Sequence, residues 1–381
     1  MNSIRSLYIM DEIGDKMYSF EPNEEQQMLI DVAKRYAEND LRAAARDAEE
    51  ECGFPQKVIE KGWELGILQA SVPGEYGGFG ERSAVTSVLA IEELAFGDMA
   101  GAIAVMAPSL FVTPILLAGS EEQKQEHIPP VIEAEWKPFT AAFIEYAYDF
   151  DPNEMKTTAT KKGDSYVLSG EKRYVPFADQ AEAMLVYANL DGQTQAFIVP
   201  GGAEGLKVGE EKEMMMGLNA LPTFVVTLED VKVSAANRLG GDEGHEIAPV
   251  LASAYVGMAA MAVGMSRASL EYASNYAKER YVLGSYIAQK QSIAFMIAEM
   301  AAEIEAIRLL VWEAAWHLDE GGEEADLCAY LALMGAIDMA MMVTDRGVQI
   351  LGGHGYIREH PVELWMRNGR GIAMLTGMAI V

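Results

Sequence analysis

The residues of this chain that are suited to chemistry do not form a metal site or a disulfide framework. The two cysteines, Cys52 and Cys328, lie far apart and form no CxxC pair. The five histidines are scattered, without the HExxH spacing or a similar arrangement of metal ligands. We therefore expect no bound metal. The most distinctive segment is Gln349-Ile350-Leu351-Gly352-Gly353-His354-Gly355-Tyr356, whose paired glycines by themselves indicate a tight turn with unusual backbone angles.

The overall composition is that of a globular protein with an acidic surface. Half of the 381 residues are apolar and 23% are charged, and the length is enough for two or three domains. The formal net charge is −29. A chain this acidic lacks the clustered lysines and arginines that nucleic-acid binding needs, and it is poorly suited to docking on anionic membranes. Nucleic acid is therefore not expected as a partner.

No targeting or membrane segment is apparent in the sequence. Asp11, Glu12 and Asp15 interrupt the N-terminal region, so no signal peptide is expected. The most apolar segment, Ala248 to Met265, is apolar on all sides, which is typical of a buried helix. We expect no apolar run long enough to span a bilayer. Because there are only two cysteines, a reducing, cytoplasmic type of compartment is expected.

The chain divides into blocks by the spacing of its apolar residues. Residues 1–21 have weak periodicity and are expected to form an extension, whereas residues 22–135 show helical spacing. Residues 136–244 are rich in short β segments, and residues 245–381 return to long helical patterns. Helix, sheet and helix in three blocks predict an α+β fold. The predicted β segments are Ala159–Gly163, Ser165–Ser169, Tyr174–Val175, Ala183–Tyr187, Gln195–Val199, Leu206–Val208 and Phe224–Leu228.

Short motifs in a fixed order accompany this plan over roughly residues 22 to 381. Besides 349–356 they are Ser71-Val72-Pro73-Gly74-Glu75-Tyr76-Gly77-Gly78-Phe79-Gly80, Ile91-Glu92-Glu93-Leu94-Ala95, Gly119-Ser120-Glu121-Glu122-Gln123-Lys124, Leu228-Glu229-Asp230-Val231-Lys232-Val233, and Ala277-Lys278-Glu279-Arg280 with Gly284 and Gln291. Each motif is weak alone. Together, and in this order, they resemble the motifs of the acyl-CoA dehydrogenase family.

The resemblance implies a fold, a reaction and a cofactor. The family's fold has an N-terminal helical domain, a middle β-barrel or β-sandwich domain, and a C-terminal four-helix bundle through which tetramers assemble. Its members use FAD to remove two hydrogens from the α and β carbons of an acyl-CoA thioester. A carboxylate takes the α proton, the β hydrogen leaves as hydride, and electrons then pass to an electron-transfer flavoprotein. The resemblance therefore implies an FAD-dependent oxidoreductase that acts on an acyl-CoA.

Five positions match residues with which the family binds FAD. The resemblance implies that Arg280 pairs with the pyrophosphate of FAD, a role that suits the forked guanidinium group. Gln291, Gln349, Gly352 and Gly353 match positions at the adenosine diphosphate half of the cofactor. In the family these groups reach across a dimer and contact the FAD of the neighbouring subunit.

The positions that carry the family's chemistry at the flavin ring are altered. Thr376 occupies the place of the catalytic glutamate of most members, and Ala254 occupies the place that carries the base in some others. Neither side chain can serve as a base. The segment that flanks the flavin ring in the family is Tyr174-Val175-Pro176 here, and a proline has no amide hydrogen to donate.

Three other residues are candidates for a relocated base or for contact with substrate. Asp98 follows Glu92-Glu93 near the region that lines the family's acyl pocket. Asp149 lies in Ile144–Asp151, within the β block, where the sequence departs from a family motif that contacts flavin and substrate, and it is able to face the flavin site. Tyr255 adjoins Ala254 and is able to hydrogen-bond a thioester. A structural or solvated role is the competing interpretation of each.

Three hypotheses about function remain open at this point. The first is an acyl-CoA dehydrogenase with a relocated base. The second is a non-catalytic subunit that contributes Arg280, Gln291, Gln349 and Gly353 to the FAD site of a paralogous partner, in a hetero-tetramer rather than a homo-tetramer. The third, with less support, is a flavin-dependent oxidase or monooxygenase on the same scaffold.

Overall fold

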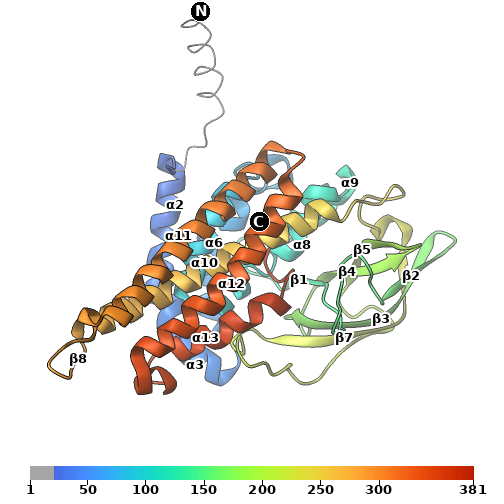
Figure 1. Ribbon diagram of the computed structural model, residues 1–381. Helices are drawn as coiled ribbons and strands as arrows, with labels where there is room; N and C mark the ends of the chain where they lie inside the picture. The colour runs from blue at the N-terminus through green and yellow to red at the C-terminus, as the bar shows by residue number, and fades with distance from the viewer. Residues whose placement is uncertain (1–20) are drawn as a thin grey trace, which may run out of the picture.

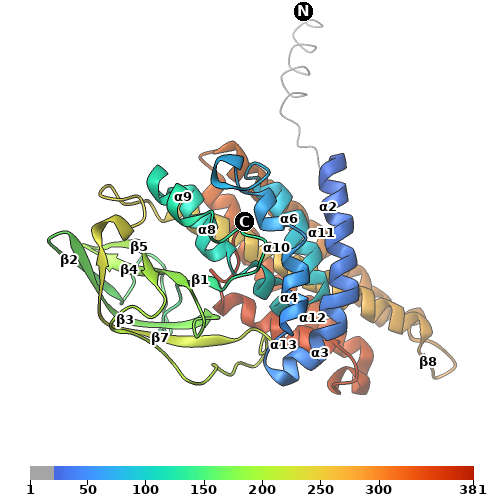
Figure 2. The same ribbon diagram turned by 180° about the vertical axis from the view of Figure 1, so that it is seen from behind.

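The computed structural model describes residues 21–381, which form a helical body with a sheet domain on one side (Figures 1 and 2). N-terminal and C-terminal helices pack together in the body, and the sheet lies against one end of it. The expected extension over residues 1–21 lies, except for its last residue, outside the described part of the chain. The blocks follow one another as helices, strands and helices, which is an α+β architecture.

The N-terminal block surrounds two buried apolar helices. All of α7 (Met99–Met106) and nearly all of α6 (Ala84–Gly97) is buried. Burial explains why α7 is apolar on every side and why α6 is apolar except for a few polar residues. The remaining helices of this block are α2 (Glu24–Tyr36), α3 (Arg42–Glu51), α4 (Gln56–Trp63), α5 (Ile67–Ala70), α8 (Ser109–Ala118) and α9 (Glu121–His127).

The β domain is a seven-stranded sheet with an apolar core of its own. Its strands are β1 (Phe139–Ala142), β2 (Thr158–Lys162), β3 (Ser165–Pro176), β4 (Ala183–Leu190), β5 (Gln193–Pro200), β6 (Leu206–Val208) and β7 (Thr223–Ser234). They are ordered β1-β4-β2-β3-β7-β6, with β5 paired to β4. Successive residues of β4 point to opposite faces, so Leu185 and Tyr187 join the core of the helical body, whereas Met184 and Val186 join the core of the sheet domain.

The C-terminal block is organised around one long central helix. This helix, α10 (Ala248–Glu279), packs against α6, α11 (Gln291–Glu320), α12 (Ala325–Leu351) and α13 (Val362–Gly371). A two-stranded hairpin, β8 (Tyr281–Val282) and β9 (Ser285–Tyr286), connects α10 to α11 and projects from the end of the helical body in Figure 1.

A buried ion cluster joins the two helical blocks. Arg267 on α10 contacts Glu92 Oε1 at 2.6 Å and Glu93 Oε1 at 2.7 Å, and Arg308 on α11 contacts Glu92 Oε1 at 2.9 Å. The motif at residues 91–95 therefore has a structural use, because its two carboxylates hold α6 against α10 and α11. Removing one partner from such a buried cluster leaves an uncompensated charge, which costs about 3–5 kcal/mol.

The expectation that no apolar helix would be long enough to cross a membrane was wrong. By length and composition α10 qualifies, and so does Ala325–Tyr356, which contains α12. The most apolar window of α10 is 83% buried inside the protein, so its apolar surface is used in packing. The corresponding window over α12 is only 44% buried, which leaves an exposed apolar face on that helix.

Candidate functional site

The first part of the site is a hollow of about 310 Å³ where α10, the β8–β9 hairpin and the end of α12 meet. We call it the outer hollow. Its lining residues are Tyr276, Arg280, Val282, Ile287, Ile350, Leu351, Gly352, Gly353 and His354. The structure thus brings together Arg280 and the Gly352–Gly353 turn, which are more than seventy residues apart in the sequence.

Local chain geometry explains why the outer hollow is open. Helix α10 ends at Glu279, and Arg280 is its C-cap in an extended conformation, after which the chain turns into the hairpin. Helix α12 ends at Leu351, and the chain continues as a 3-10 turn over Gly352–Tyr356. Gly352 has a φ of +59°, and a Cβ atom built on Gly352 or Gly353 would meet no atom within 4 Å. Backbone at these glycines is therefore free for a ligand to approach.

The charge in the outer hollow is positive. Arg280 is exposed and makes no ion pair among the described residues, and no carboxylate lines the hollow. Such an arrangement favours an anion, since an unpaired guanidinium can donate two parallel hydrogen bonds to a phosphate. Gln291, at the start of α11, and Gln349, in the last turn of α12, are exposed but do not line the hollow.

The second part is a small enclosed space between α8, β1, the start of α10 and the C-terminal segment. We call it the inner cavity. Its lining residues are Leu110, Pro114, Ala141, Phe143, Tyr187, Val250, Leu251, Ala254, Gly377 and Ile380. Of the two positions that carry the base in other family members according to the resemblance, Ala254 lines this cavity. Thr376 does not line it, but its neighbour Gly377 does. At about 20 Å³ the cavity has room for little more than one water molecule.

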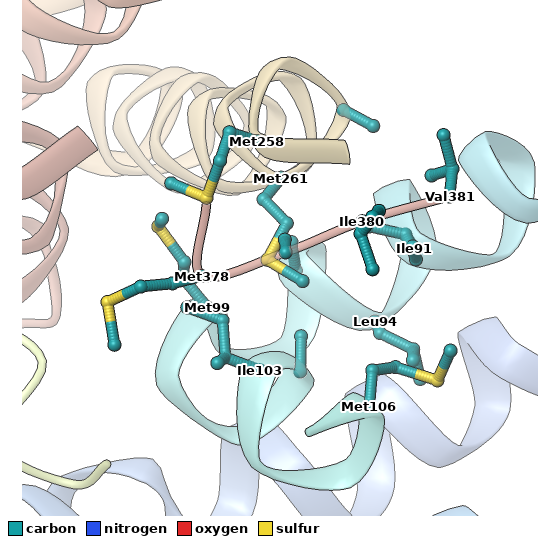
Figure 3. Packing of buried hydrophobic residues seen from close by; sticks show 14 of the residues in the cluster. Ile91, Leu94, Met99, Ile103, Met106, Met258, Met261, Met378, Ile380 and Val381 are labelled. Carbon is teal, nitrogen blue, oxygen red and sulfur yellow. The ribbon is translucent and has the colours of Figure 1, made fainter. Parts of the chain in front are cut away.

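The chain's own C-terminal residues fill the space around the inner cavity. Met378, Ile380 and Val381 lie between α10 and the helices α6 and α7, in contact with a buried cluster that includes several methionines (Figure 3). The Val381 carbonyl oxygen accepts hydrogen bonds from Arg82 Nη2 at 2.9 Å and from the Ser253 hydroxyl. The region that the resemblance assigns to an acyl group is therefore occupied by packed side chains.

None of the three candidate acids and donors lines the inner cavity. Asp98 lies between α6 and α7, where its side chain accepts the backbone N–H of Gly101 at 2.8 Å as the N-cap of α7. Burial raises the pKa of Asp98 to about 6. Asp149 is 86% exposed and lies 4.0 Å from Lys156, which is the geometry of a solvated loop carboxylate. Tyr255 is half-buried against Tyr330, and burial raises its pKa.

The sequence interpretation missed the one polar side chain of the inner cavity. Tyr187 on β4 is 2% exposed, its ring packs edge-on against Phe143 at 5.0 Å, and its hydroxyl has no hydrogen-bond partner among residues 21–381. Burial raises the pKa of Tyr187, so the hydroxyl stays neutral and acts as a donor. The available signal was the period-two pattern of 183–187, which places residues 185 and 187 on one face.

The segment Tyr174-Val175-Pro176 ends β3 with strained backbone. Tyr174 has a φ of +53°, which is rare for a residue with a side chain. Its N–H is donated to Glu213 Oε2 at 2.5 Å, and Pro176 has none, so neither amide is available to a ligand. A further hollow of about 270 Å³, lined by Tyr174, the methionines 214–216 and Leu375 among others, lies beside this segment.

Within residues 21–381 no group of histidine, cysteine, aspartate or glutamate side chains is arranged to hold a metal ion. The groups available for chemistry at the site are therefore its hydrogen-bond donors. The outer hollow can bind an anion, and the inner cavity offers a single neutral hydroxyl without a carboxylate base.

Comparison with family models covers most of the chain. Residues 23–135 match the acyl-CoA dehydrogenase N-terminal domain, residues 143–231 match the middle domain, and residues 249–379 match the C-terminal domain. The three models follow the same order as the helical, sheet and helical blocks of the fold.

Individual relatives and solved structures agree with the family models. The 3-(aryl)acrylate reductase of Clostridium sporogenes is 33% identical, and the caffeyl-CoA reductase–Etf complex subunit CarC of Acetobacterium woodii is 34% identical. Each comparison covers 94% of this chain and 96% of the relative. The structure of butyryl-CoA dehydrogenase from Megasphaera elsdenii has a TM-score of 0.86 at 33% identity, covering 94% of this chain and 96% of that one. The chain belongs to the acyl-CoA dehydrogenase family.

Proposed function

We propose that this chain is a subunit of an FAD-dependent, acyl-CoA dehydrogenase-type oxidoreductase, and that its outer hollow completes the FAD site of a neighbouring subunit. One observation carries the proposal: the outer hollow is open and has an unpaired cation, whereas the inner cavity is filled and has no carboxylate. FAD, when bound, supplies two-electron hydride chemistry at the β carbon of an acyl thioester.

The outer hollow fits the diphosphate half of FAD. Arg280 offers a guanidinium group without an ion-pair partner among the described residues, and Gly352 and Gly353 leave backbone uncovered. Apolar side chains such as Ile287 and Leu351 line the rest of the hollow and suit the flat faces of a nucleotide. Gln291 and Gln349 lie on the flanking helix ends and are exposed, so a cofactor that extends beyond the hollow can reach them.

The inner cavity does not fit the acyl group in its present packing. A cavity of about 20 Å³ holds no acyl chain, and Ala254 and Gly377 offer no side-chain base. In a tetramer of identical chains both halves of each site come from the same sequence, so both would be expected to persist. A paralogous partner that supplies the ring-side half accounts for the persistence of the outer half alone.

Assembly through the C-terminal helices is part of the proposal. Large apolar side chains are exposed on one face of α11 and α12, namely Phe295 at 57%, Leu327 at 58%, Tyr330 at 49% and Leu331 at 51%. Exposed apolar surface of this kind is typical of subunit interfaces. We propose a dimer of dimers, either homomeric or with a paralogue, in a cytoplasmic compartment. An electron-transfer flavoprotein is the proposed redox partner, since one relative is named as a subunit of an Etf complex.

A second candidate function is a self-sufficient acyl-CoA oxidoreductase with a relocated base, in which Tyr187 donates a hydrogen bond to the thioester oxygen. Tyr187 favours it, because a buried hydroxyl without a partner in the described chain, aligned beside Phe143, is expensive to keep unless a ligand uses it. In this alternative Phe143 and the residues of the C-terminal segment move aside, and the Tyr187 hydroxyl donates to the acyl ligand.

The test is to purify the chain alone and record its visible spectrum, flavin content and subunit number, then to repeat this with co-expressed paralogues. The first proposal predicts a colourless lone chain and a mixed tetramer with about one FAD per two chains. One FAD per subunit in the lone chain, bleached by an acyl-CoA, would establish the second candidate instead. In that case Tyr187→Phe should lower the rate of bleaching without changing the flavin content.

A further inference from the structure

We infer that His354 is a further ligand-contacting residue of the outer hollow, which donates its Nε2–H to a phosphate oxygen of the bound dinucleotide. The inference rests on the proposed function of that hollow. His354 lines the outer hollow together with Arg280 and the glycine turn, and it is half-buried there. Its assigned role is to present one defined donor, Nε2–H, to the ligand.

The hydrogen bond on the other ring nitrogen selects the tautomer. The Tyr276 hydroxyl lies 2.7 Å from His354 Nδ1 and has no other hydrogen-bond partner among residues 21–381. If the hydroxyl donates, its hydrogen is satisfied and Nδ1 is the acceptor, so a neutral ring must carry its hydrogen on Nε2. The opposite arrangement leaves the hydroxyl hydrogen without an acceptor, which costs free energy in a partly buried position.

Packing holds the ring in one orientation before any ligand binds. His354 stacks on His360 with ring centroids 5.4 Å apart and an interplanar angle of 22°. The His360 ring is held in the same way, because its Nδ1 lies 2.8 Å from the Tyr272 hydroxyl. A side chain at Gly355 would collide with the carbonyl oxygen of Val348, so the turn that carries His354 is pressed against α12. A donor fixed in advance loses little conformational entropy on binding.

The surroundings identify the ligand group as an anion. The side chains that line the outer hollow include the Arg280 guanidinium and the His354 imidazole, and no carboxylate. The lining therefore carries a cation and no acid, although the chain as a whole has a net charge of −29. Two donors beside the open backbone of Gly352 and Gly353 suit phosphate oxygens, whereas the adenine ring would meet the apolar wall formed by Ile287 and Leu351.

The test uses the FAD-loaded assembly in which only this chain is varied. His354→Ala should raise the dissociation constant of FAD about 10- to 100-fold, as expected for one hydrogen bond to a charged group. His354→Gln, whose amide N–H can take the place of Nε2–H, should restore binding to within about threefold. Tyr276→Phe should weaken FAD binding less than His354→Ala and more than His354→Gln, because the hydrogen bond that selects the Nε2–H tautomer of His354 is lost.

A spectroscopic measurement gives a readout that does not depend on flavin. Nitrogen NMR of ¹⁵N-histidine-labelled chain should show a protonated Nε2 and an unprotonated Nδ1 at His354, and Tyr276→Phe should reduce this preference. Protonated Nδ1 would overturn the inference. It would also be overturned if His354→Ala and His354→Gln weakened FAD binding equally, since that outcome indicates a packing role.

Arg280→Gln separates failure of this inference from failure of the proposed function. If Arg280→Gln loses FAD while His354→Ala retains it, the outer hollow is a cofactor site in which His354 takes no part. If neither substitution changes FAD binding, the outer hollow is not a cofactor site, and the inference falls with the proposed function.

Discussion

The outer hollow and the inner cavity lie at opposite ends of one helix, and they differ in how their polar groups are used. Ala254 and Arg280 are separated along α10 by roughly 39 Å, from the helical rise per residue. At the C-terminal end Arg280 has no ion-pair partner among residues 21–381, and glycine backbone stays uncovered. At the other end apolar residues have filled the space. An open hollow thus coincides with polar groups left without internal partners, and a region lined by apolar side chains is packed as core.

The largest expected effect on stability comes from truncating a side chain that lines the inner cavity. Ile380→Ala removes a side chain that is 4% exposed and lines the inner cavity. Because the packed surroundings relax only partly, the free energy of unfolding should fall by about 2–5 kcal/mol, measured by urea denaturation. Ile357→Ala is the matched control, since Ile357 is 39% exposed near the outer hollow, and it should cost less than about 0.5 kcal/mol. Equal losses in the two variants would mean that residue 380 is not packed as core.

A pH-dependent effect should identify Asp98 as a structural cap. Its folded-state pKa of about 6 lies above its ordinary value of 3.8, so the ionised form is disfavoured in the folded protein. The cost is fully present above pH 6 and is lost as the pH falls towards 4. Asp98→Asn keeps the cap but removes the ionisation, because asparagine also accepts at an N-cap. The unfolding free energy of the variant relative to wild type should therefore be higher at pH 7 than at pH 4.5, by about 2 kcal/mol.

The outcome that would contradict this assignment is a loss of function. If Asp98→Asn abolished acyl-CoA-dependent flavin reduction in the assembly while the stability difference stayed independent of pH, Asp98 would act as a base rather than as a cap.

Removal of the unpaired cation tests the open end. Arg280→Gln should raise the dissociation constant of FAD by about 10- to 100-fold, the range for a charge-assisted bidentate contact. The free energy of unfolding of the apo chain should change by less than about 0.5 kcal/mol, because Arg280 makes no ion pair among the described residues. Flavin fluorescence measures the first quantity and urea denaturation the second. Lys278→Gln removes the same charge from the last turn of α10, outside the hollow, and should leave FAD binding unchanged.

The smallest effect is expected at Asp149, which belongs to neither region. Asp149→Asn should change the free energy of unfolding by less than about 0.5 kcal/mol, because the carboxylate is 86% exposed and its pair with Lys156 is long. FAD binding and turnover should also stay the same. A loss of turnover in this variant, measured against wild type at equal flavin content, would return Asp149 to the list of candidate bases.

The spacing of apolar residues predicted which segments form strands better than it predicted where each strand begins and ends. The segment Leu206–Val208 is strand β6 with the predicted ends. Residues 165–169 and 174–175 were predicted as two segments, but both belong to strand β3. The sequence pattern breaks within this strand because irregular pairing with β7, after Leu168 and after Lys172, interrupts the alternation of the side chains. Strand β1 (Phe139–Ala142) was not predicted. It is short and fully buried, so it lacks the alternation that marks a half-exposed strand.

The two parts of the site were predictable to different degrees. Arg280, Gly352 and Gly353 were assigned together from motifs, and the structure places them in one hollow. The fixed histidine beside them could not be found from spacing, because the contact between Tyr276 and His354 depends on how α10 packs against α12. The filling of the inner cavity was also outside the reach of sequence. The resemblance places Thr376 and Ala254 where other members carry the base, but only packing determines which residues surround the inner cavity.

The methionines packed around the C-terminal segment make the core next to the inner cavity deformable. Met99, Met106, Met258, Met261 and Met378 are each at most 6% exposed, and they surround the C-terminal segment (Figure 3). A methionine has three rotatable bonds and no branch, so its thioether can change position without movement of the backbone. A wall of leucine and isoleucine of equal volume would be stiffer. The interior at this end of α10 should therefore be more compressible than the alanine-rich contact between α10 and α12, and apolar guests of different shapes should enter it at similar free-energy cost.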